Sequence, residues 1–208
     1  MDLSVYVITD RRVGGRSHEE VAEGAVEGGA TALQFREKAM TTRQLIEAAG
    51  RLRAIARRRG VLFIVNDRVD VALAVDADGV HVGEDDMPVA LARRLMGPEK
   101  IVGVSASSPE EALAAVRDGA SYLGVGSVYA TATKPEAGAP IGSARLAAVR
   151  RAVSVPVVAI GGITIENAAE AIRAGADGVA VISAVAGAPD PVAAARRLRE
   201  VVDAARRR

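Results

Sequence analysis

Short apolar runs alternate with alanine-rich segments of helical periodicity along the whole 208-residue chain. Runs this short and this uniformly apolar are typical of parallel strands that are covered on both faces. Because each run is followed by a helical segment, the order predicts an α/β fold, a single (β/α)8 TIM barrel, with a doubly wound open sheet as the alternative. The predicted strands are Ser4–Thr9, Ala32–Arg36, Leu62–Asn66, Gly79–Val82, Ile101–Ser105, Tyr122–Val125, Val157–Ile160 and Gly178–Val181.

The turns that lead into every second predicted strand resemble one another. They are Gly29–Leu33, Asp76–Val80, Gly119–Leu123 and Gly175–Val179. Recurrence of one helix-to-strand turn at every second strand favours a quasi-symmetric barrel over an open sheet. No linker, low-complexity tract or block of charge divides the sequence, so we predict one catalytic domain over residues 1–208.

The sequence also marks where several helices begin. Three pairs fit capping boxes, namely Ser17 with Glu20, Thr41 with Gln44, and Ser108 with Glu111. Pro109 and Pro191 stand at expected first helical positions, and Pro191 follows the expected N-cap Asp190.

Composition argues against several classes of function. The net charge is +1 and only 2% of residues are aromatic, so the basic stripe and aromatic platforms of a nucleic-acid-binding protein are missing. The absence of cysteine excludes disulfides, thiolate metal sites and cysteine nucleophiles. No signal peptide or run of transmembrane length is visible, so we expect a cytoplasmic protein with no membrane partner. The oligomeric state is left open, with a homodimer as one option.

Polar residues gather where the predicted strands end, and this is the face of a TIM barrel that carries catalysis. Arg36, Lys38 and Lys134 supply cations from opposite sides of this mouth and can hold a pyrophosphate. Either lysine alone would be an ordinary solvated charge, whereas Arg36 lies within an apolar strand. Lys134 lies in a long loop, from about Gly126 to Gly142, that we expect to act as a lid.

Two carboxylates follow adjacent predicted strands, Asp67 after the third and Asp86 after the fourth. Mg²⁺ usually takes one or two protein carboxylates together with water and phosphate oxygens, so we predict a Mg²⁺ site here. The alternatives are that each aspartate is only a helix N-cap, and that Asp85 rather than Asp86 holds the metal. His81 is expected to point into the barrel as a satisfied core histidine.

The last two predicted strands end in residues that offer backbone N–H groups near helix N-termini. These are Gly161-Gly162 and Ile182-Ser183, at the usual barrel site for a phosphate monoester. The plain alternatives are a tight turn at the glycines and an ordinary polar loop at Thr131 and Thr133. Two anion sites, one of them with a metal, predict two phosphorylated small-molecule substrates.

Taken in order, these segments resemble the thiamine phosphate synthase family. The matching segments are Gln34–Lys38, Val65–Arg68, Gly79–Asp86, Gly103–Ser105, Thr131–Lys134, Ile160–Ile163 and Val181–Ala184. They cover nearly the whole chain, and seven in order are highly specific. The sequence departs from the family pattern at Ser127, where the family commonly has Pro, and in a slightly short spacing from Lys134 to Gly162, which leaves Gly161 as a competitor for its role.

The resemblance implies a Mg²⁺-dependent transferase. It would join hydroxymethylpyrimidine pyrophosphate to a thiazole phosphate, or its carboxylate, giving thiamine phosphate and pyrophosphate. The resemblance places Mg²⁺ on Asp67 and Asp86. It places the pyrimidine pyrophosphate on Gln34, Phe35, Arg36, Glu37, Lys38, Asn66, Ser105 and Lys134. It places the thiazole phosphate on Thr131, Ala132, Thr133, Gly162, Ile182 and Ser183.

The expected catalytic residues are Arg36, Lys38, Ser105 and Lys134. The main task of the protein would be to stabilise charge on the departing pyrophosphate, because an electron-rich aminopyrimidine can release it by a dissociative path. The thiazole nitrogen would then attack, needing position more than activation.

Three other functions remain open. A thiazole tautomerase of the same fold would not need Asp67, Asp86 or the pyrophosphate cations. An aldolase would need a Schiff-base lysine within a strand, and no predicted strand contains one. A non-catalytic sensor of the thiazole phosphate would bind one ligand without Mg²⁺-dependent turnover.

Overall fold

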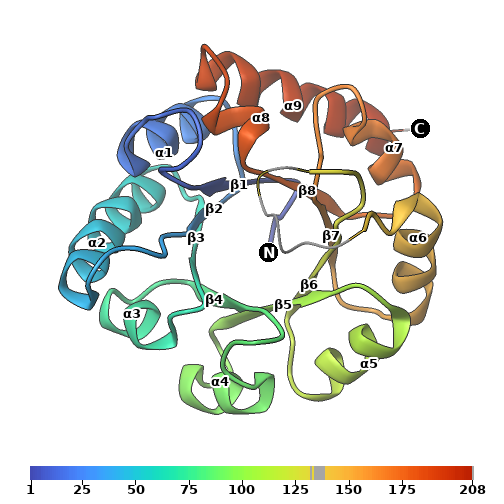
Figure 1. Ribbon diagram of the computed structural model, residues 1–208, viewed down its shortest axis with the longest axis horizontal. Coiled ribbons are helices and arrows are strands. Elements are labelled where there is room, and N and C mark those ends of the chain that lie inside the picture. Colours follow the sequence, from blue (N-terminus) through green and yellow to red (C-terminus); the bar gives the residue numbers. More distant parts are fainter. Residues whose placement is uncertain (132, 134–138, 208) are drawn as a thin grey trace.

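A closed barrel of parallel strands forms the centre of the computed structural model, which describes residues 1–131, 133 and 139–207. Strands β1 to β8 follow one another around the barrel in chain order (Figure 1). The circle closes where β1 pairs with β8, with Tyr6 opposite Ala180. The predicted barrel is therefore confirmed, and the open-sheet alternative is wrong.

The strands agree with the predicted runs to within one residue at either end. They are β1 (Val5–Thr9), β2 (Ala32–Phe35), β3 (Leu62–Asn66), β4 (Gly79–Val82), β5 (Ile101–Ala106), β6 (Tyr122–Val125), β7 (Val157–Ile160) and β8 (Gly178–Val181). The helices are α1 (His18–Glu27), α2 (Thr42–Arg58), α3 (Val69–Ala74), α4 (Val89–Met96), α5 (Pro109–Arg117), α6 (Gly142–Ala152), α7 (Ala168–Arg173), α8 (Ser183–Ala186) and α9 (Pro191–Arg206).

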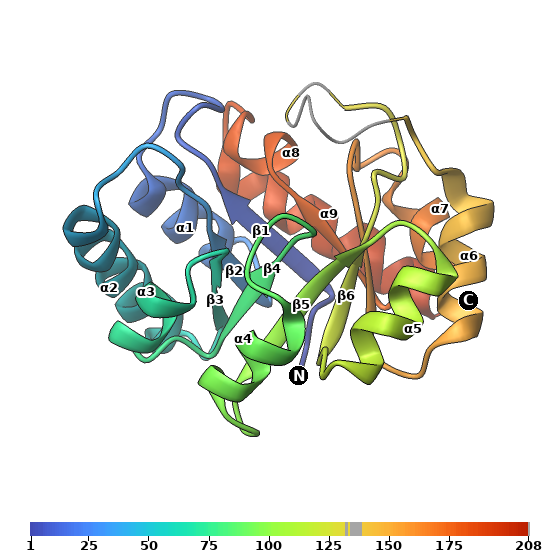
Figure 2. The ribbon, with the colours of Figure 1, turned by 60° about the horizontal axis from the view of Figure 1, so that its bottom comes forward.

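The helices surround the strands as an outer ring, and the side chains form two separate cores (Figures 1 and 2). The larger core lies between strands and helices and consists mainly of Ala, Val, Ile and Leu. The smaller core fills the barrel interior and contains Tyr6 and Tyr122 among aliphatic residues such as Ile64 and Val158. Because side chains alternate along each strand, every strand except β4 contributes to both cores, and β4 contributes Val80 and Val82 to the larger one.

The recurring turn has a hydrogen-bonding function that explains why it repeats. The residue immediately before β2, β4, β6 and β8 accepts, through a side-chain oxygen, a hydrogen bond from a backbone N–H of the preceding odd-numbered strand, at 2.8–3.1 Å. Its own backbone N–H donates to the carbonyl of the same partner at 2.7–3.0 Å. The pairs are Thr31 with Val5, Asp78 with Phe63, Ser121 with Val102, and Asp177 with Val157. These bonds close the N-terminal face of the barrel, opposite the mouth.

The predicted helix starts are confirmed, with one difference. Ser17 and Thr41 form complete capping boxes, and Asp190 accepts from the N–H of Ala193 at 3.0 Å. Ser108 caps α5, but the carboxylate of Glu111 accepts from the N–H of Ser107 rather than that of Ser108. The φ of Ser108 is −139°, against −67° at Ser17, and this rotates the N–H of Ser108 away from the helix.

The described part of the chain contains no helix that is both long enough and apolar enough to span a membrane.

Candidate active site

Two adjoining cavities occupy the mouth, the end of the barrel where the strands finish. The larger has a volume of about 380 Å³ and the smaller about 80 Å³. They share a wall made by Ser105, Gly124, Ile160, Ala180 and Ile182. The shared residues place the two cavities side by side in the mouth.

The smaller cavity brings together residues on which the family resemblance places the pyrimidine pyrophosphate. Gln34, Arg36, Asn66 and Ser105 line it. They come from the ends of β2, β3 and β5, and apolar side chains of β1, β7 and β8 complete the wall. The cavity therefore combines one apolar side with several hydrogen-bonding groups.

The larger cavity brings together the residues assigned to the thiazole phosphate. Thr131, Thr133, Gly162 and Ser183 line it, together with Ile182 of the shared wall. Thr131 accepts a hydrogen bond from the N–H of Thr133 at 3.2 Å, so the two threonines form a local turn. Two further predicted site residues, Ala132 and Lys134, lie outside the described residues.

The glycine pair after β7 is shaped by close backbone contact. Gly161 and Gly162 have φ values of +91° and +64°, in the left-handed region. A Cβ atom on Gly161 would lie 2.4 Å from Ser127 Oγ, and one on Gly162 would lie 2.4 Å from the carbonyl oxygen of Ala130. Both glycines line the larger cavity, so the choice between them as a phosphate contact stays open.

The loop after β6 is attached to the same turn. Val128 and Tyr129 donate backbone hydrogen bonds to the carbonyls of Ile160 and Gly161, at 2.9 and 3.0 Å. At the far end of the loop, the N–H of Ile141 donates a hydrogen bond to the carbonyl of Ser127 at 2.8 Å. Its role as a lid stays a prediction.

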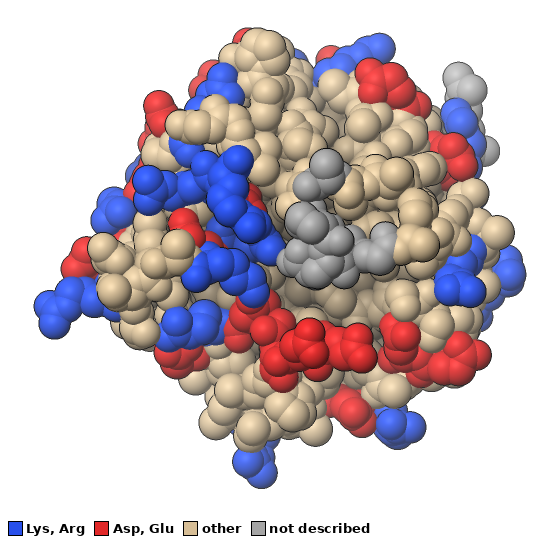
Figure 3. Space-filling model, in the orientation of Figure 1, with Lys and Arg blue, Asp and Glu red and all other residues tan. Residues whose placement is uncertain are grey.

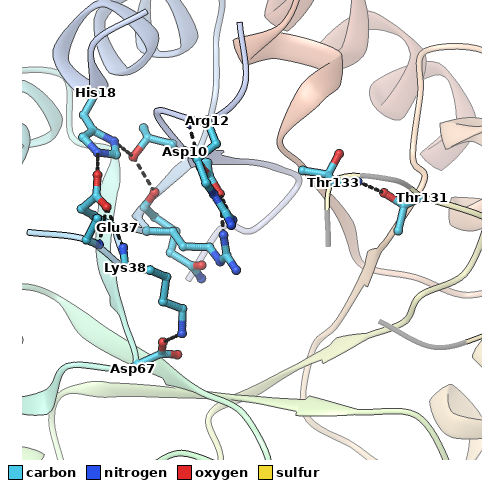
Figure 4. A network of polar contacts seen from close by, with 12 residues as sticks. Asp10, Arg12, His18, Glu37, Lys38, Asp67, Thr131 and Thr133 are labelled. Atoms are coloured by element: carbon cyan, nitrogen blue, oxygen red, sulfur yellow. Dashed lines mark hydrogen bonds and ion pairs between the residues drawn. The ribbon is translucent and has the colours of Figure 1, made fainter. Parts of the chain in front are cut away.

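A buried ion pair holds Arg36 at the end of β2. The Arg36 guanidinium contacts the carboxylate of Asp10, and their side chains are only 8% and 4% exposed. Arg12 binds the same carboxylate in a two-pronged contact, at 3.0 and 2.8 Å, but is 61% exposed (Figure 4). Burial alone would raise the pKa of Asp10, but hydrogen bonds from Arg12 and the charge of Arg36 outweigh it, so the pKa is lowered.

The loop after β2 is shaped by a buried histidine. His18 hydrogen-bonds through Nδ1 to Thr9 Oγ1 at 2.8 Å and through Nε2 to Glu37 at 3.3 Å. The other carboxylate oxygen of Glu37 accepts from the N–H groups of Lys38 and Ala39, both at 2.7 Å. Burial lowers the pKa of His18, and the neighbouring Glu37 only partly opposes this.

Two of the predicted substrate residues have side chains engaged elsewhere, and their roles as substrate contacts stay predictions. The side chain of Phe35 lies in the outer core, with its ring 4.8 Å from that of His18, and so faces away from the mouth. The reason is strand alternation, since Gln34 takes the inward position and Phe35 the outward one. The carboxylate of Glu37 is committed to its own loop and to His18, so it organises the loop rather than facing a substrate anion.

The two predicted metal ligands face each other at the ends of β3 and β4. Burial and the adjacent Asp86 carboxyl group raise the pKa of Asp67, while the Lys38 ammonium group, which contacts Asp67, opposes the rise. Asp86 accepts a hydrogen bond from the N–H of Gly83 at 2.8 Å. Asp85 is exposed and lines the larger cavity instead.

The N-cap alternative for both aspartates is wrong. The residues at the N-cap positions of α3 and α4 are Arg68 and Pro88, and neither makes a side-chain cap hydrogen bond. Asp67 also has a φ of +63°, which is unusual for a residue other than glycine. An unfavourable backbone conformation beside a like charge suggests a site kept for binding rather than for stability.

The aspartate pair has the ligand chemistry expected for Mg²⁺. Within residues 1–131, 133 and 139–207, no group of three or more His, Asp or Glu side chains is placed to hold a metal ion. Mg²⁺ does not need such a cage, because it usually takes one or two carboxylates and completes its shell with water and substrate phosphate. A cation between Asp67 and Asp86 would also relieve their mutual repulsion.

Charges of opposite sign lie on different sides of the mouth. Figure 3 shows Lys and Arg side chains gathered over the ends of β1 and β2, and Asp and Glu side chains over the ends of β4 and β5. Arg12 and Lys38, 61% and 52% exposed, belong to the basic side. Glu84 and Asp85 belong to the acidic side and line the larger cavity.

A chain of hydrogen bonds crosses the floor of the mouth. Gln34 Nε2 donates to the Tyr6 hydroxyl at 2.9 Å, and Tyr6 contacts the Tyr122 hydroxyl at 2.9 Å. Tyr122 contacts His81 Nδ1 at 2.9 Å, and His81 Nε2 contacts Ser105 Oγ at 3.0 Å. The prediction that His81 points into the barrel as a satisfied histidine is confirmed.

Comparison with known proteins identifies the family. A family model described as thiamine monophosphate synthase matches residues 5–185. The chain belongs to the thiamine monophosphate synthase family. It is 63% identical to a thiamine-phosphate synthase of Chloroflexus aurantiacus, over 97% of this chain and 94% of that protein. It is 58% identical to one from Moorella thermoacetica, over 99% and 97% of the two chains.

The fold comparison agrees with the sequence comparison. A thiamine phosphate pyrophosphorylase from Pyrococcus furiosus superposes with a TM-score of 0.92 at 48% sequence identity, covering 98% of this chain and 96% of that chain. Membership of the thiamine monophosphate synthase family makes the chain an enzyme, and specifically a transferase. The tautomerase, aldolase and sensor alternatives are therefore set aside.

Five residues of this thiamine monophosphate synthase site were missed by sequence reasoning. Asp10 directly follows β1, so the rule that located the other strand-end residues would have found it. From the sequence pattern, His18 is an ordinary first residue of a capped helix, and Tyr6 and Tyr122 are ordinary core residues. Arg12 is an exposed arginine two residues beyond a strand, with no pattern around it.

Proposed function

We propose that the chain is a Mg²⁺-dependent thiamine phosphate synthase that joins hydroxymethylpyrimidine pyrophosphate to a thiazole phosphate or its carboxylate, with release of pyrophosphate. The pair of adjoining cavities carries this proposal, because each has the chemistry of one substrate and they share a wall.

The smaller cavity suits the pyrimidine ring. A flat aminopyrimidine has two apolar faces and polar edges. Ile8 and Val158 would cover its faces, and the amides of Gln34 and Asn66 would hydrogen-bond to its edge. The pyrophosphate would extend toward Arg36, which lines the same cavity.

The pyrophosphate end would be held by a metal cation and by positively charged side chains. Asp67 and Asp86 would hold Mg²⁺, which, when bound, neutralises charge on phosphate oxygens. Arg36 is fixed by Asp10 and would bring its positive charge to the anion in the cavity that it lines. Lys38 contacts Asp67 and would add a second positive charge from the same loop. Lys134 is proposed to supply a third positively charged side chain.

The larger cavity would take the thiazole phosphate. The turn at Gly161-Gly162 and the start of α8 at Ser183 bring backbone N–H groups and a hydroxyl to the cavity wall. Thr131 and Thr133 of the loop after β6 would contact the phosphate from the opposite side of the cavity. The thiazole ring would then lie against the wall shared with the pyrimidine cavity.

The reaction follows from this placement. The bond between the pyrimidine methylene carbon and the pyrophosphate oxygen breaks, and its electron pair leaves with the pyrophosphate. Arg36 and Lys38 stabilise that charge as it develops. The thiazole nitrogen then forms the new bond to the methylene carbon from the adjoining cavity, which supplies position rather than activation. Closure of the β6 loop would exclude water from the pyrimidine cation.

Metal-dependent binding of pyrophosphate tests the proposal. Titration calorimetry with pyrophosphate, with and without Mg²⁺, is expected to show that Asp67→Asn and Asp86→Asn each weaken binding in Mg²⁺ at least about tenfold. Asp85→Asn is the matched control, since it removes an adjacent exposed carboxylate and should leave the affinity unchanged. Equal losses in all three variants, or binding that ignores Mg²⁺, would contradict the assigned metal site.

We also propose the cytoplasm as the compartment and a homodimer as an option for the assembly. The absence of cysteine suits a reducing compartment. Sedimentation equilibrium of the purified protein would decide between a monomer and a dimer.

A further inference from the structure

The hydrogen-bond chain under the mouth links residues on opposite sides of it. It begins at Gln34 on β2, passes through Tyr6 and Tyr122, and reaches Ser105 on β5 through His81. Tyr6 and Tyr122 are 2% and 0% exposed, so water does not interrupt the chain between them. Burial raises the pKa of both tyrosines, so each hydroxyl keeps its proton in the neutral range.

The barrel makes room for this chain at two strand glycines. A Cβ atom on Gly103 would lie 2.2 Å from Cζ of Tyr122, and one on Gly124 would lie 3.0 Å from Cε1 of His81. Glycine within a strand weakens the strand, and it often marks a close approach of another group. The interior is therefore shaped around these two polar rings rather than filled with aliphatic side chains.

The direction of the chain follows from the orientation of the Gln34 amide, whose Nε2 faces the Tyr6 hydroxyl. Gln34 Nε2 can only donate, so the Tyr6 hydroxyl accepts from it. Both tyrosine hydroxyls are buried and each proton needs an acceptor, so Tyr6 donates to Tyr122, and Tyr122 in turn donates to His81 Nδ1. His81 Nδ1 is an acceptor only in the tautomer that carries its proton on Nε2.

We infer that Tyr6 and Tyr122 are positioning residues, which hold His81 in the Nε2–H tautomer and so oblige Ser105 to donate its hydroxyl proton into the mouth. In this tautomer His81 Nε2–H donates to Ser105 Oγ, so the hydroxyl proton of Ser105 points away from His81. Ser105 is exposed and lines both cavities, so the proton meets whatever ligand lies at the shared wall.

A donor at this point selects for an acceptor on the ligand. The shared wall is where the bond to pyrophosphate breaks, if the proposed function is correct, and the inference rests on that function only for the identity of the acceptor. A hydroxyl aimed in advance at the leaving oxygen stabilises its developing charge without reorganising during the reaction. A serine that donated to His81 instead would present lone pairs to an anion and would oppose binding.

The histidine tautomer can be measured without any substrate. The chain has two histidines, His18 and His81, so two-bond ¹H–¹⁵N correlation spectra of histidine-labelled protein contain two sets of ring signals. In a sample of the His18→Gln variant, only the ring signals of His81 remain. We expect the pattern of a ring protonated on Nε2. A ring of His81 protonated on Nδ1 would overturn the inference, because the chain would then run in the opposite direction.

Removing one hydroxyl tests whether the tyrosines act through Ser105. Tyr6→Phe deletes the proton that fixes Tyr122, so we expect His81 to become a mixture of tautomers and kcat for thiamine phosphate formation to fall about fivefold. In a Ser105→Ala background the same change should alter kcat less than about twofold, since the residue it acts through is gone. Tyr122→Phe provides a second variant should Tyr6→Phe fold poorly.

Ile64→Val is the matched control, because it lies in the same interior core and removes a methyl group but no polar atom. It should leave the tautomer of His81 and the value of kcat unchanged. Equal effects of Tyr6→Phe with and without Ser105, or loss of kcat with an unchanged tautomer, would mean that Tyr6 only supports the barrel. A protein without synthase activity but with the expected tautomer would overturn the proposed function and leave the proton arrangement standing.

Discussion

Neutralising Asp10 should cost the protein much more stability than removing its exposed partner. Asp10→Asn keeps the size of the side chain and removes the charge that Arg36 faces inside the protein. The two side chains are 4% and 8% exposed, so water cannot replace the lost carboxylate effectively. Arg12 contacts the same carboxylate but is 61% exposed, and its loss should matter little.

The expected size of the effect follows from burial. Removing one partner of a buried ion pair typically costs about 3–5 kcal/mol, and we expect the lower end, about 3 kcal/mol, because the pair lies beside an open mouth. For a chain of this length that corresponds to a fall in Tm of roughly 6–12 °C. Arg12→Ala should cost about 1 kcal/mol or less, or no more than roughly 4 °C.

Differential scanning calorimetry of wild type, Asp10→Asn and Arg12→Ala at neutral pH measures both effects. The pH dependence gives a second check. The pKa of Asp10 is lowered in the folded protein, so its stabilisation is present above the unfolded value of about 3.9 and is lost as the pH falls through the folded value. The gap in Tm between wild type and Asp10→Asn should therefore narrow below about pH 4. If Asp10→Asn lowered Tm no more than Arg12→Ala, the buried pair would not be what holds Arg36 in place.

Three further predictions concern other parts of the barrel. Ser121→Ala and Asp177→Ala each leave a strand N–H without its acceptor on the face opposite the mouth, so urea titration should show losses of about 1–2 kcal/mol with kcat unchanged. Gly162→Ala places a Cβ 2.4 Å from the carbonyl of Ala130, so kcat/KM for the thiazole phosphate should fall at least about tenfold; Gly60→Ala, with a similar φ of +66° and open space around it, should leave kcat/KM unchanged. The pKa of Tyr6 is raised in the folded protein, so as the pH rises the unfolded chain loses this proton first. The free energy of unfolding should therefore fall above about pH 10, by up to about 1.4 kcal/mol per pH unit. Urea titrations at pH 9 to 11 should find a smaller slope in Tyr6→Phe.

The fold was predictable because its signals are local and repeated. Each strand is a short apolar run, and the turn that contains Asp78 or Asp177 recurs with the same hydrogen bonds, so sequence alone located it. The face that carries the site was predictable for the same reason, since parallel strands of a barrel end together. The reciprocal bond of Glu111 was assigned one residue away from where it forms, because the backbone angle of Ser108 has no signature in the sequence.

The interior of the site was harder to predict because it depends on register between strands. Tyr6 and Tyr122 are far apart in the sequence and meet only because their strands tilt across the barrel, with Gly103 leaving space for the ring. Whether Phe35 faces the mouth depends on which of two alternating positions Gln34 takes, and a run of apolar residues does not show this. The contact between Lys38 and Asp67 likewise joins two loops that the sequence treats separately.

The most direct test of the account is formation of thiamine phosphate from hydroxymethylpyrimidine pyrophosphate and the thiazole phosphate, followed by oxidation of the product to its fluorescent derivative. The account predicts product with both substrates and Mg²⁺, and loss of at least about 99% of the rate in Asp67→Asn or when a chelator removes the metal. Asp118→Asn, which changes an exposed carboxylate that lines neither cavity, should keep the wild-type rate. Product formation that needed neither Mg²⁺ nor Asp67 would contradict the claim that the mouth joins two anionic substrates through a metal-assisted pyrophosphate site.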